Sequence, residues 1–183
     1  VKLFEGVRIL DLSRMLAGPY GSMLLADMGA EVIKIEEPAG GDPIRAMGPP
    51  FLSDGESAYF LAINRNKKSV ALDLGREAGR EVFYDLVRRS DVVLENFRPG
   101  IMERLGCPYA KLWSLNQRII VCSLSAYGQE GPYRDWPAFD LALQAMGGAM
   151  SVTGEPGRPP VRMGLPMGDL AGGMFGAFAV AGA

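Results

Sequence analysis

One carboxylate, Asp169, stands in a stretch of small and apolar residues that runs from Gly164 to Gly173. Pro166 precedes it and an apolar run from Leu170 to Ala183 follows, a pattern that predicts a helix with the carboxylate in its first turn. Free N–H groups and the helix dipole stabilise a negative charge there. The small neighbours leave room for a reactant, so Asp169 is a candidate nucleophile that stays ionised. The alternative interpretation is an aspartate that only caps a buried helix.

The composition excludes several kinds of site. The 183 residues include no histidine, which excludes a Ser-His-Asp triad, a histidine general base and histidine-ligated metal within this chain. Two cysteines are too few for a disulfide framework or a zinc site, so we expect no metal. The 19 basic and 21 acidic residues nearly balance, which argues against a nucleic acid or a membrane surface recognised by bulk charge.

The elements that must position this carboxylate alternate along the chain. Buried strands are predicted at residues 7–12, 31–36, 69–74, 91–95 and 118–125. Helices are predicted at 20–28, 57–63, 76–89, 101–105, 109–115, 140–150 and from Asp169 onward. The alternation predicts an α/β fold, with an open, mostly parallel sheet, Rossmann-like βαβ units and helices on both faces. The Gly- and Pro-rich segment 38–54 is too long for a simple connection and is interpreted as a functional surface loop.

Cationic, amide and aromatic residues follow the predicted strands. Arg14 follows the first strand, Asn96-Phe97-Arg98 the fourth, and Ser125-Ala126-Tyr127 the fifth. Ligands of open α/β sheets bind beyond the carboxyl ends of the strands. The set suits a phosphate-bearing ligand with a flat ring, since Arg binds phosphate and Phe97 can stack on a ring. The alternative is that residues 64–68 form a solvated loop and Phe97 lies at the edge of the core.

Neither common nucleotide fingerprint is present. The first βα turn carries Gly18-Pro19-Tyr20-Gly21, which has the wrong spacing for G-x-G-x-x-G and a proline in the tight turn. No G-x-x-x-x-G-K-[ST] occurs anywhere in the sequence. Dinucleotide-binding and P-loop sites are therefore excluded.

Six short pieces, in order, carry a resemblance to a known family. They are Ile9–Leu12 with Leu16–Pro19; Leu25–Glu36; Asn64–Ser69; Asp91–Gly100; Ser125–Gly128; and Gly168–Gly172. Together they resemble the class III coenzyme A transferases, the CaiB/BaiF family that includes formyl-CoA:oxalate and carnitine CoA-transferases. Each piece alone is a weak signal, whereas six in the right order and spacing are a strong one.

The resemblance implies a catalytic residue and a set of coenzyme A contacts. Asp169 matches the family's catalytic aspartate. The implied coenzyme A contacts are Arg14, Leu16, Ala17, Leu72, Asp73, Leu74, Gly75, Asn96, Phe97, Arg98, Arg104, Ala138 and Asp140. Coenzyme A and acyl-CoA are then substrates, with no permanently bound cofactor.

Two departures from the family pattern concern the phosphates of coenzyme A. Gly75 and Pro137 fall where some relatives place a lysine on phosphate, and Glu37 falls where some place an arginine. Phosphate binding is therefore expected to depend on Arg104 and on Lys67 or Lys68.

The implied reaction moves coenzyme A from an acyl-CoA thioester to a small carboxylic acid. Asp169 would form a mixed anhydride with the acyl group and then an aspartyl-CoA thioester. One alternative is a coenzyme A-binding fragment without catalysis. A further alternative is an α-methylacyl-CoA racemase, which needs a histidine where this chain has Phe139. The acyl donor and the acceptor stay open.

The resemblance also implies an organisation larger than this chain. Family members are longer, with a second domain and an interlocked homodimer, so residues 1–183 are expected to be a truncated N-terminal coenzyme A-binding domain without the second domain. The chain begins at Val1 and ends within a helical pattern. We expect a cytoplasmic protein, with the mitochondrial matrix as the alternative if the N-terminus has been trimmed.

Overall fold

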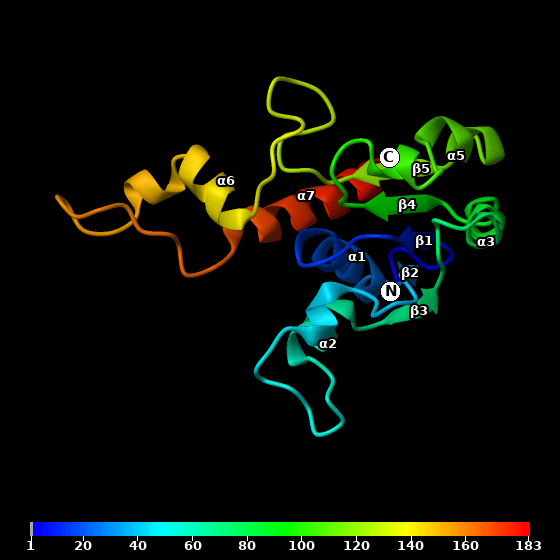
Figure 1. The fold of residues 1–183 in the computed structure, drawn as a ribbon, viewed down its shortest axis with the longest axis horizontal. Coiled ribbons are helices and arrows are strands. Elements are labelled where there is room, and N and C mark those ends of the chain that lie inside the picture. The colour runs from blue at the N-terminus through cyan, green and yellow to red at the C-terminus, as the bar shows by residue number, and fades with distance from the viewer. Residues whose placement is uncertain (1) are drawn as a thin grey trace.

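A five-stranded parallel sheet forms the centre of the protein (Figure 1). The computed structural model describes residues 2–183. The strands are β1 (Arg8–Asp11), β2 (Glu31–Glu36), β3 (Lys67–Ala71), β4 (Val92–Glu95) and β5 (Ile120–Ser123), in the order β3-β2-β1-β4-β5. All the pairings between them are parallel, which confirms the predicted α/β fold. The strand order reverses direction between β1 and β4, where open α/β sheets bind ligands.

Helices connect the strands and continue beyond β5. They are α1 (Ala17–Asp27), α2 (Ala58–Asn64), α3 (Glu77–Val87), α4 (Ile101–Arg104), α5 (Tyr109–Leu115), α6 (Asp140–Met146) and α7 (Met167–Gly182), with 3-10 helices η1 (Pro43–Ala46) and η2 (Ala149–Val152). Within residues 2–183, no helix combines the length and the hydropathy needed to span a membrane.

Three predicted elements have a boundary that was wrong by three residues or more. Helix α1 begins at Ala17 rather than at residue 20, because Pro19 lies in its first turn, where a missing N–H breaks no hydrogen bond. Strand β3 covers 67–71 rather than 69–74, since Lys67 already pairs in register with Val32. Helix α6 ends at Met146, where two glycines follow and Gly148 has a φ of +81°.

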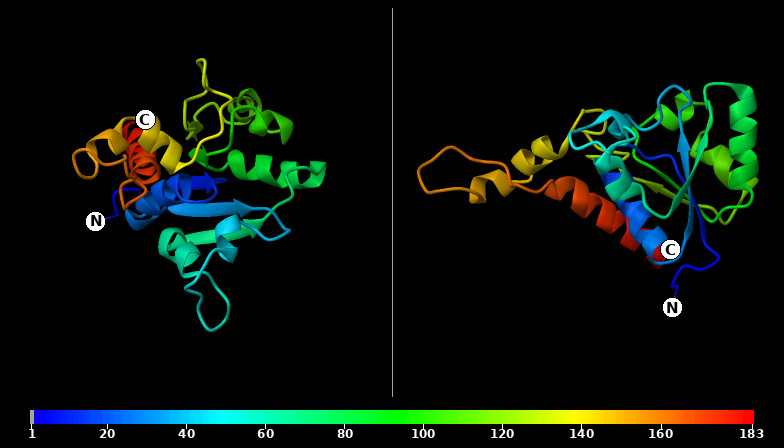
Figure 2. Two further views of the ribbon diagram at one scale, coloured as in Figure 1. Left: turned by 60° about the vertical axis from the view of Figure 1, so that its left-hand side comes forward. Right: turned by 90° about the horizontal axis from the view of Figure 1, so that it is seen from below.

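Helices cover both faces of the sheet (Figure 2). Successive residues of a strand point to opposite faces. Ile9 and Leu94 are buried in the cluster that includes residues of α1 and α7. Leu10 and Val93 are buried in the cluster that includes residues of α3, α4 and α5. The predicted helices on both faces are thereby confirmed.

The two helices on the first face, α1 and α7, touch through their backbones. A Cβ atom built on Gly21 of α1 would lie 2.6 Å from the carbonyl oxygen of Gly173 in α7. A Cβ on Gly173 would in turn meet the carbonyl oxygen of Ala17 and lie 3.1 Å from the backbone nitrogen of Gly21. Only glycine permits this approach, so the pair fixes how α7 lies along α1.

Residues 139–166 project from the body of the domain as an arm that holds α6 and η2 (Figure 2). The arm and the outer side of α7 expose large apolar side chains. They include Val152 at 86%, Phe139 and Phe178 at 78%, and Phe175 at 73%. Monomeric proteins rarely leave so much apolar surface uncovered.

A buried ion pair supports the turn between β1 and α1. Lys34 Nζ lies 3.0 Å from Asp42 Oδ2 and donates a hydrogen bond of 2.8 Å to the carbonyl oxygen of Ser13. Asp42 also accepts a hydrogen bond from the backbone N–H of Met15, which has a φ of +66°. A left-handed conformation is unusual for methionine, so these bonds hold a strained turn in place.

The free energy of unfolding should fall as the pH drops from about 4.5 toward 2, because of Glu36. Burial alone would raise the pKa of Glu36, but Arg45, Ser69 and the N–H of Asp42 outweigh burial and lower it from 4.5 to about 2. A depressed folded-state pKa stabilises the protein above the unfolded pKa, and protonation removes that contribution, on the order of 2–3 kcal/mol.

Urea denaturation at several pH values, with Glu36→Gln beside the wild type, tests this expectation. The variant should be less stable at pH 7 and should lose less stability in acid. Glu81→Gln on the exposed side of α3 serves as the control. Equal acid sensitivity of the wild type and Glu36→Gln would contradict the prediction.

Candidate active site

The structure confirms that Asp169 lies in the first turn of a helix, α7. Pro166 at the N-cap supplies no side-chain hydrogen bond. Asp140 of α6 supplies it instead: its Oδ1 accepts hydrogen bonds from the backbone N–H of Gly168 (2.7 Å) and of Asp169 (3.4 Å). The nucleophile candidate is therefore held at a helix N-terminus that another element caps.

The electrostatic environment of Asp169 differs from the prediction that its helix position keeps it ionised. Burial raises the pKa of Asp169, and the nearby Asp140 carboxylate raises it further. Once ionised, a carboxylate with a raised pKa is the stronger base and nucleophile.

Any reaction that needs ionised Asp169 should lose rate as the pH falls, with a midpoint above 3.8. The raised pKa means that Asp169 takes up its proton at a pH at which an ordinary aspartate is still charged. The measurement is kcat/KM against pH from 3.5 to 8, because kcat/KM reports the pKa values of the free enzyme. Circular dichroism at each pH shows that the protein stays folded. A midpoint at or below 3.8 would contradict the assignment.

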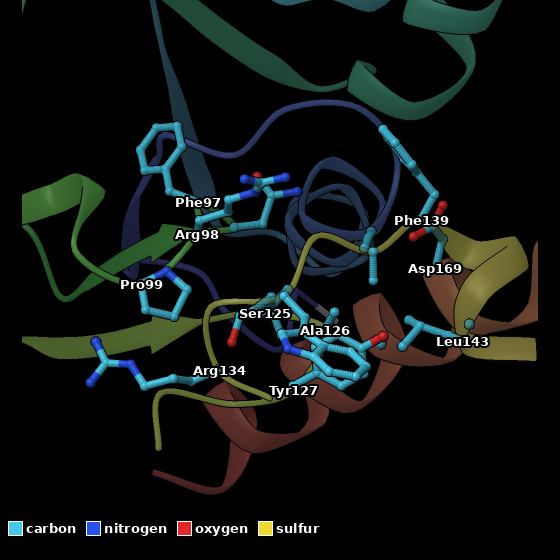
Figure 3. Close-up of a pocket in the computed structure, with 17 residues that line it drawn as sticks. Phe97, Arg98, Pro99, Ser125, Ala126, Tyr127, Arg134, Phe139, Leu143 and Asp169 are labelled. Carbon is cyan, nitrogen blue, oxygen red and sulfur yellow. The ribbon is translucent and has the colours of Figure 1, made fainter. Parts of the chain in front are cut away.

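A cavity of about 290 Å³ adjoins Asp169 at the carboxyl edge of the sheet (Figure 3). The residues that line this Asp169 cavity come from the turns after β4 and β5, the loop before α6, α6 itself, and the beginnings of α1 and α7. The lining residues are Ala17, Asn96–Pro99, Leu124–Tyr127, Arg134, Trp136, Ala138, Phe139, Leu143, Gly168, Asp169 and Gly172. Figure 3 shows Asp169 and Phe139 at one end, with Phe97 and Arg134 at the other.

A second cavity of about 300 Å³, the Leu74 cavity, lies beyond Phe97. It is lined by Leu12, Arg14, Ile35–Glu37, Leu72–Gly75, Phe97 and Leu105. Phe97 borders both cavities, and the guanidinium of Arg14 lies 5.3 Å from the centre of its ring. The two cavities meet at this Arg14–Phe97 contact. The arrangement suits a long ligand that fills the Leu74 cavity with one end and brings its reactive group into the Asp169 cavity with the other.

Most of the predicted site residues border these cavities. Asp169, Ala17, Asn96, Phe97, Arg98 and Ala138 line the Asp169 cavity. Arg14, Leu72, Asp73, Leu74, Gly75 and Phe97 line the Leu74 cavity. Glu37 also lies in the Leu74 cavity, with its carboxylate 3.9 Å from Arg14.

Three predicted contact residues lie outside both cavities. Leu16 is buried in a hydrophobic cluster with Met23 and Phe60. Asp140 is buried too, with its carboxylate directed at the start of α7. Arg104 is exposed on α4, next to Leu105 of the Leu74 cavity.

The amide of Asn96 holds the backbone of Arg14. Asn96 Oδ1 accepts a hydrogen bond of 2.8 Å from the Arg14 N–H, and Asn96 Nδ2 donates one of 2.7 Å to the Arg14 carbonyl oxygen. The turn after β4 is thus tied to the turn after β1, and both bear cavity residues.

The expectation that Lys67 binds phosphate was wrong. Its ammonium group is buried and donates to Asp11 Oδ2 (3.0 Å), the carbonyl oxygen of Pro19 and Asn64 Oδ1 (each 2.8 Å). Lys68 pairs with Glu31 at 2.5 Å, at the amino end of β2 and away from the cavities. Of the predicted phosphate ligands, Arg104 alone stays exposed near a cavity.

Several residues of the site were missed from the sequence. Arg134 and Trp136, from the segment between β5 and α6, line the Asp169 cavity, and neither was predicted. Residues 96–98 were predicted as site residues because a cation stands beside an aromatic ring there. Arg134 and Trp136 form the same pattern, which could have predicted them. Tyr59 was missed too: it packs against the same hydrophobic cluster as Leu170 of α7, and burial and the charges of Asp169 and Asp42 raise the pKa of its hydroxyl. No pattern in the sequence marks Tyr59.

A doubly covered parallel sheet, with a carboxylate and two cavities that share Phe97 at its carboxyl edge, defines an α/β protein of the Rossmann-like class. The family model for CoA-transferase family III matches residues 4–183. The chain therefore belongs to CoA-transferase family III.

Several relatives are similar to this chain. Acetyl-CoA:oxalate CoA-transferase of Acetobacter aceti is 46% identical over 173 residues, which are 94% of this chain and 44% of that enzyme. Succinyl-CoA:glutarate CoA-transferase of Mus musculus is 46% identical over 96% of this chain and 40% of its own length. The chain thus spans less than half the length of these relatives.

Solved structures agree with the fold. A CAIB/BAIF family protein from Brucella suis superimposes with a TM-score of 0.93 at 40% identity, over 97% of this chain and 48% of that one. A hypothetical protein, Rv3272, from Mycobacterium tuberculosis gives a TM-score of 0.90 at 40% identity, over 100% of this chain and 50% of that one.

Proposed function

We propose that this chain is the N-terminal, coenzyme A-binding domain of an enzyme that moves coenzyme A from an acyl-CoA to a carboxylic acid. One observation carries the proposal: Asp169, in the first turn of α7, borders a cavity that meets a second cavity at Phe97. The second cavity can hold the nucleotide end of coenzyme A while the thioester reaches Asp169.

The nucleotide end of coenzyme A would lie in the Leu74 cavity. Leu72–Gly75 would enclose the ring, and Arg14 and Arg104 would supply positive charge for the phosphates. The pantetheine arm would pass Phe97 and continue along Asn96, Arg98 and Ala17 toward Ala138 and Asp169. Leu16 and Asp140 would support these contacts from behind.

Asp169 would act as the nucleophile in two half-reactions. Its carboxylate attacks the thioester carbonyl, the C–S bond breaks, and a mixed anhydride and the coenzyme A thiolate form. The thiolate attacks the aspartyl carbonyl, which releases the donor carboxylate and leaves an aspartyl-CoA thioester. The acceptor carboxylate then attacks this thioester and forms a second anhydride, which the thiolate opens to give the new acyl-CoA and free Asp169.

We propose a dicarboxylic acid as the acceptor. Relatives are named for transfer to oxalate, glutarate and mesaconate, each of which carries a second carboxylate. Arg98 lines the Asp169 cavity and would offset the charge of that second carboxylate.

The remainder of the enzyme would cover the apolar surface of the arm and of α7. Phe139, Phe175 and Phe178 are exposed to more than 70% of their surface. A second domain and an interlocked homodimer would bury them.

The free thiols of Cys107 and Cys122 suit a reducing compartment, and we propose the cytoplasm.

The test incubates the full-length protein with a panel of acyl-CoA donors and a panel of mono- and dicarboxylic acids. New acyl-CoA species are read by mass spectrometry, and hydroxylamine traps the acylated enzyme. A new thioester, with a hydroxamate on Asp169, supports the transferase. Coenzyme A binding without transfer by any pair would favour the non-catalytic binding module. Exchange of α-deuterium without transfer would favour the racemase.

A further inference from the structure

Gln144 of α6 is a buried residue whose side-chain amide bonds in three directions. It is 3% exposed. Its Nε2 donates to Asp140 Oδ2 (2.7 Å) and to the carbonyl oxygen of Leu165 (3.1 Å). Its Oε1 accepts a hydrogen bond of 2.8 Å from the backbone N–H of Met163. Both donors and the acceptor of the amide are thereby used.

These three bonds converge on the start of α7. Asp140 is the side chain that caps α7 at Gly168 and Asp169, through its other carboxylate oxygen. Met163 and Leu165 belong to the segment that leads into Pro166, just before α7 begins. Gln144 therefore holds both the cap of the helix and the chain that enters it.

The segment that leads into α7 needs such an anchor. Residues 153–166 hold no helix or strand and are mostly exposed, with several glycines and prolines. The arm also projects from the body of the domain (Figure 2), so the sheet does not support it directly. Without Gln144, Asp140 Oδ2 would lose its hydrogen-bond donor, and residues 163–165 would lose the two hydrogen bonds that tie them to α6.

We propose that Gln144 is a positioning residue that sets the orientation of the Asp169 carboxylate through Asp140 and the Met163–Leu165 segment. This inference rests on the proposed function, in which Asp169 is the nucleophile. A bound nucleophile reacts fast only from a narrow range of positions, so a loosened first turn lowers the rate of attack. The Leu74 cavity, where the nucleotide end of coenzyme A would bind, lies on other elements, so the dissociation constant of coenzyme A should change little.

Position 144 needs a side chain that both donates and accepts hydrogen bonds, as an amide does. Leucine has a similar volume but neither donates nor accepts. Glutamate accepts but cannot donate when ionised, and it would put a second carboxylate against Asp140. Both Gln144→Leu and Gln144→Glu should therefore release the start of α7.

The first measurement is hydrogen exchange of the peptide that spans Gly164–Gly172, in the full-length protein. The Gly168 N–H donates to Asp140, so both variants should exchange it at least tenfold faster than the wild type. Thr153→Val is the matched control, because the Thr153 hydroxyl bonds within the same arm, to Ala149, and not toward α7. Unchanged exchange in the Gln144 variants overturns the proposal, whatever the activity.

The second measurement is the single-turnover reaction of the enzyme with acyl-CoA, read as the covalent adduct on Asp169 by quenched-flow mass spectrometry. The rate constant should fall at least tenfold in both variants, while the dissociation constant of coenzyme A stays within twofold. The amplitude reports the competent fraction, so partial unfolding would lower the amplitude and leave the rate constant unchanged. That outcome, or a normal rate constant with faster exchange, overturns the proposal. A wild type that never acylates refutes the proposed function, and hydrogen exchange then decides the positioning role alone.

Discussion

Replacing Asp169 with alanine or asparagine should lower CoA transfer by about 10³-fold or more, because the reaction loses the group that forms both covalent intermediates. Binding of coenzyme A should change little, since Arg14 and Leu72–Gly75 lie in the other cavity. The measurements are kcat for transfer and the dissociation constant of coenzyme A by calorimetry. Hydroxylamine should trap no acylated enzyme in either variant.

The loss should not come from unfolding. Asp169 is half-buried beside the Asp140 carboxylate, so asparagine removes a like-charge repulsion and should leave the melting temperature equal or higher. Asp85→Ala on the exposed side of α3 is the control and should transfer normally. Wild-type transfer by Asp169→Asn would exclude Asp169 as the nucleophile.

Replacing Gly173 with valine should lower the free energy of unfolding by about 3 kcal/mol or more. Added atoms would run into the backbone of Ala17 and Gly21 and the ring of Tyr20, which lies 3.1 Å from the position of a Cβ. Backbone atoms of a packed helix cannot move aside as a flexible side chain can. Helix α7 must then separate from α1 or tilt, and Asp169 would move with it.

Gly182→Ala, in the same helix, separates this steric effect from helix propensity. A Cβ at Gly182 meets no atom within 4 Å, so alanine there should be neutral or stabilising by up to about 1 kcal/mol. Chemical denaturation measures both variants. If Gly173→Val is as stable as Gly182→Ala, the two helices are not held at backbone contact.

The sheet and the place of Asp169 could be predicted because both depend on local pattern. Apolar runs such as Ile9–Leu12 and Val92–Leu94 mark buried parallel strands, and Pro166 before an apolar run marks a helix start. Each signal lies within a few neighbouring residues. The burial of Lys67 could not be found in this way, because its partners Asp11 and Pro19 are distant in sequence.

The capping of α7 was equally hidden from the sequence. Asp140 is 28 residues from Gly168, and its role depends on how α6 lies against α7. The contacts of Asn96 and Leu16 could not be predicted either. Asn96 bonds the backbone of Arg14, and Leu16 packs against Phe60, and only the tertiary fold creates these contacts. Patterns thus identify which loops form the site, and packing decides which side chains within them face the ligand.

The meeting of the two cavities at Phe97 has a kinetic consequence for the proposed reaction. A nucleotide held in the Leu74 cavity stays bound after the thioester breaks, so the freed thiol remains tethered beside the anhydride. Tethering gives that thiol an effective concentration in the millimolar range or higher, far above that of free coenzyme A in most assays. Recapture of the acyl group by the same molecule should then outpace attack by water. Radiolabelled free coenzyme A should enter the product only slowly during turnover.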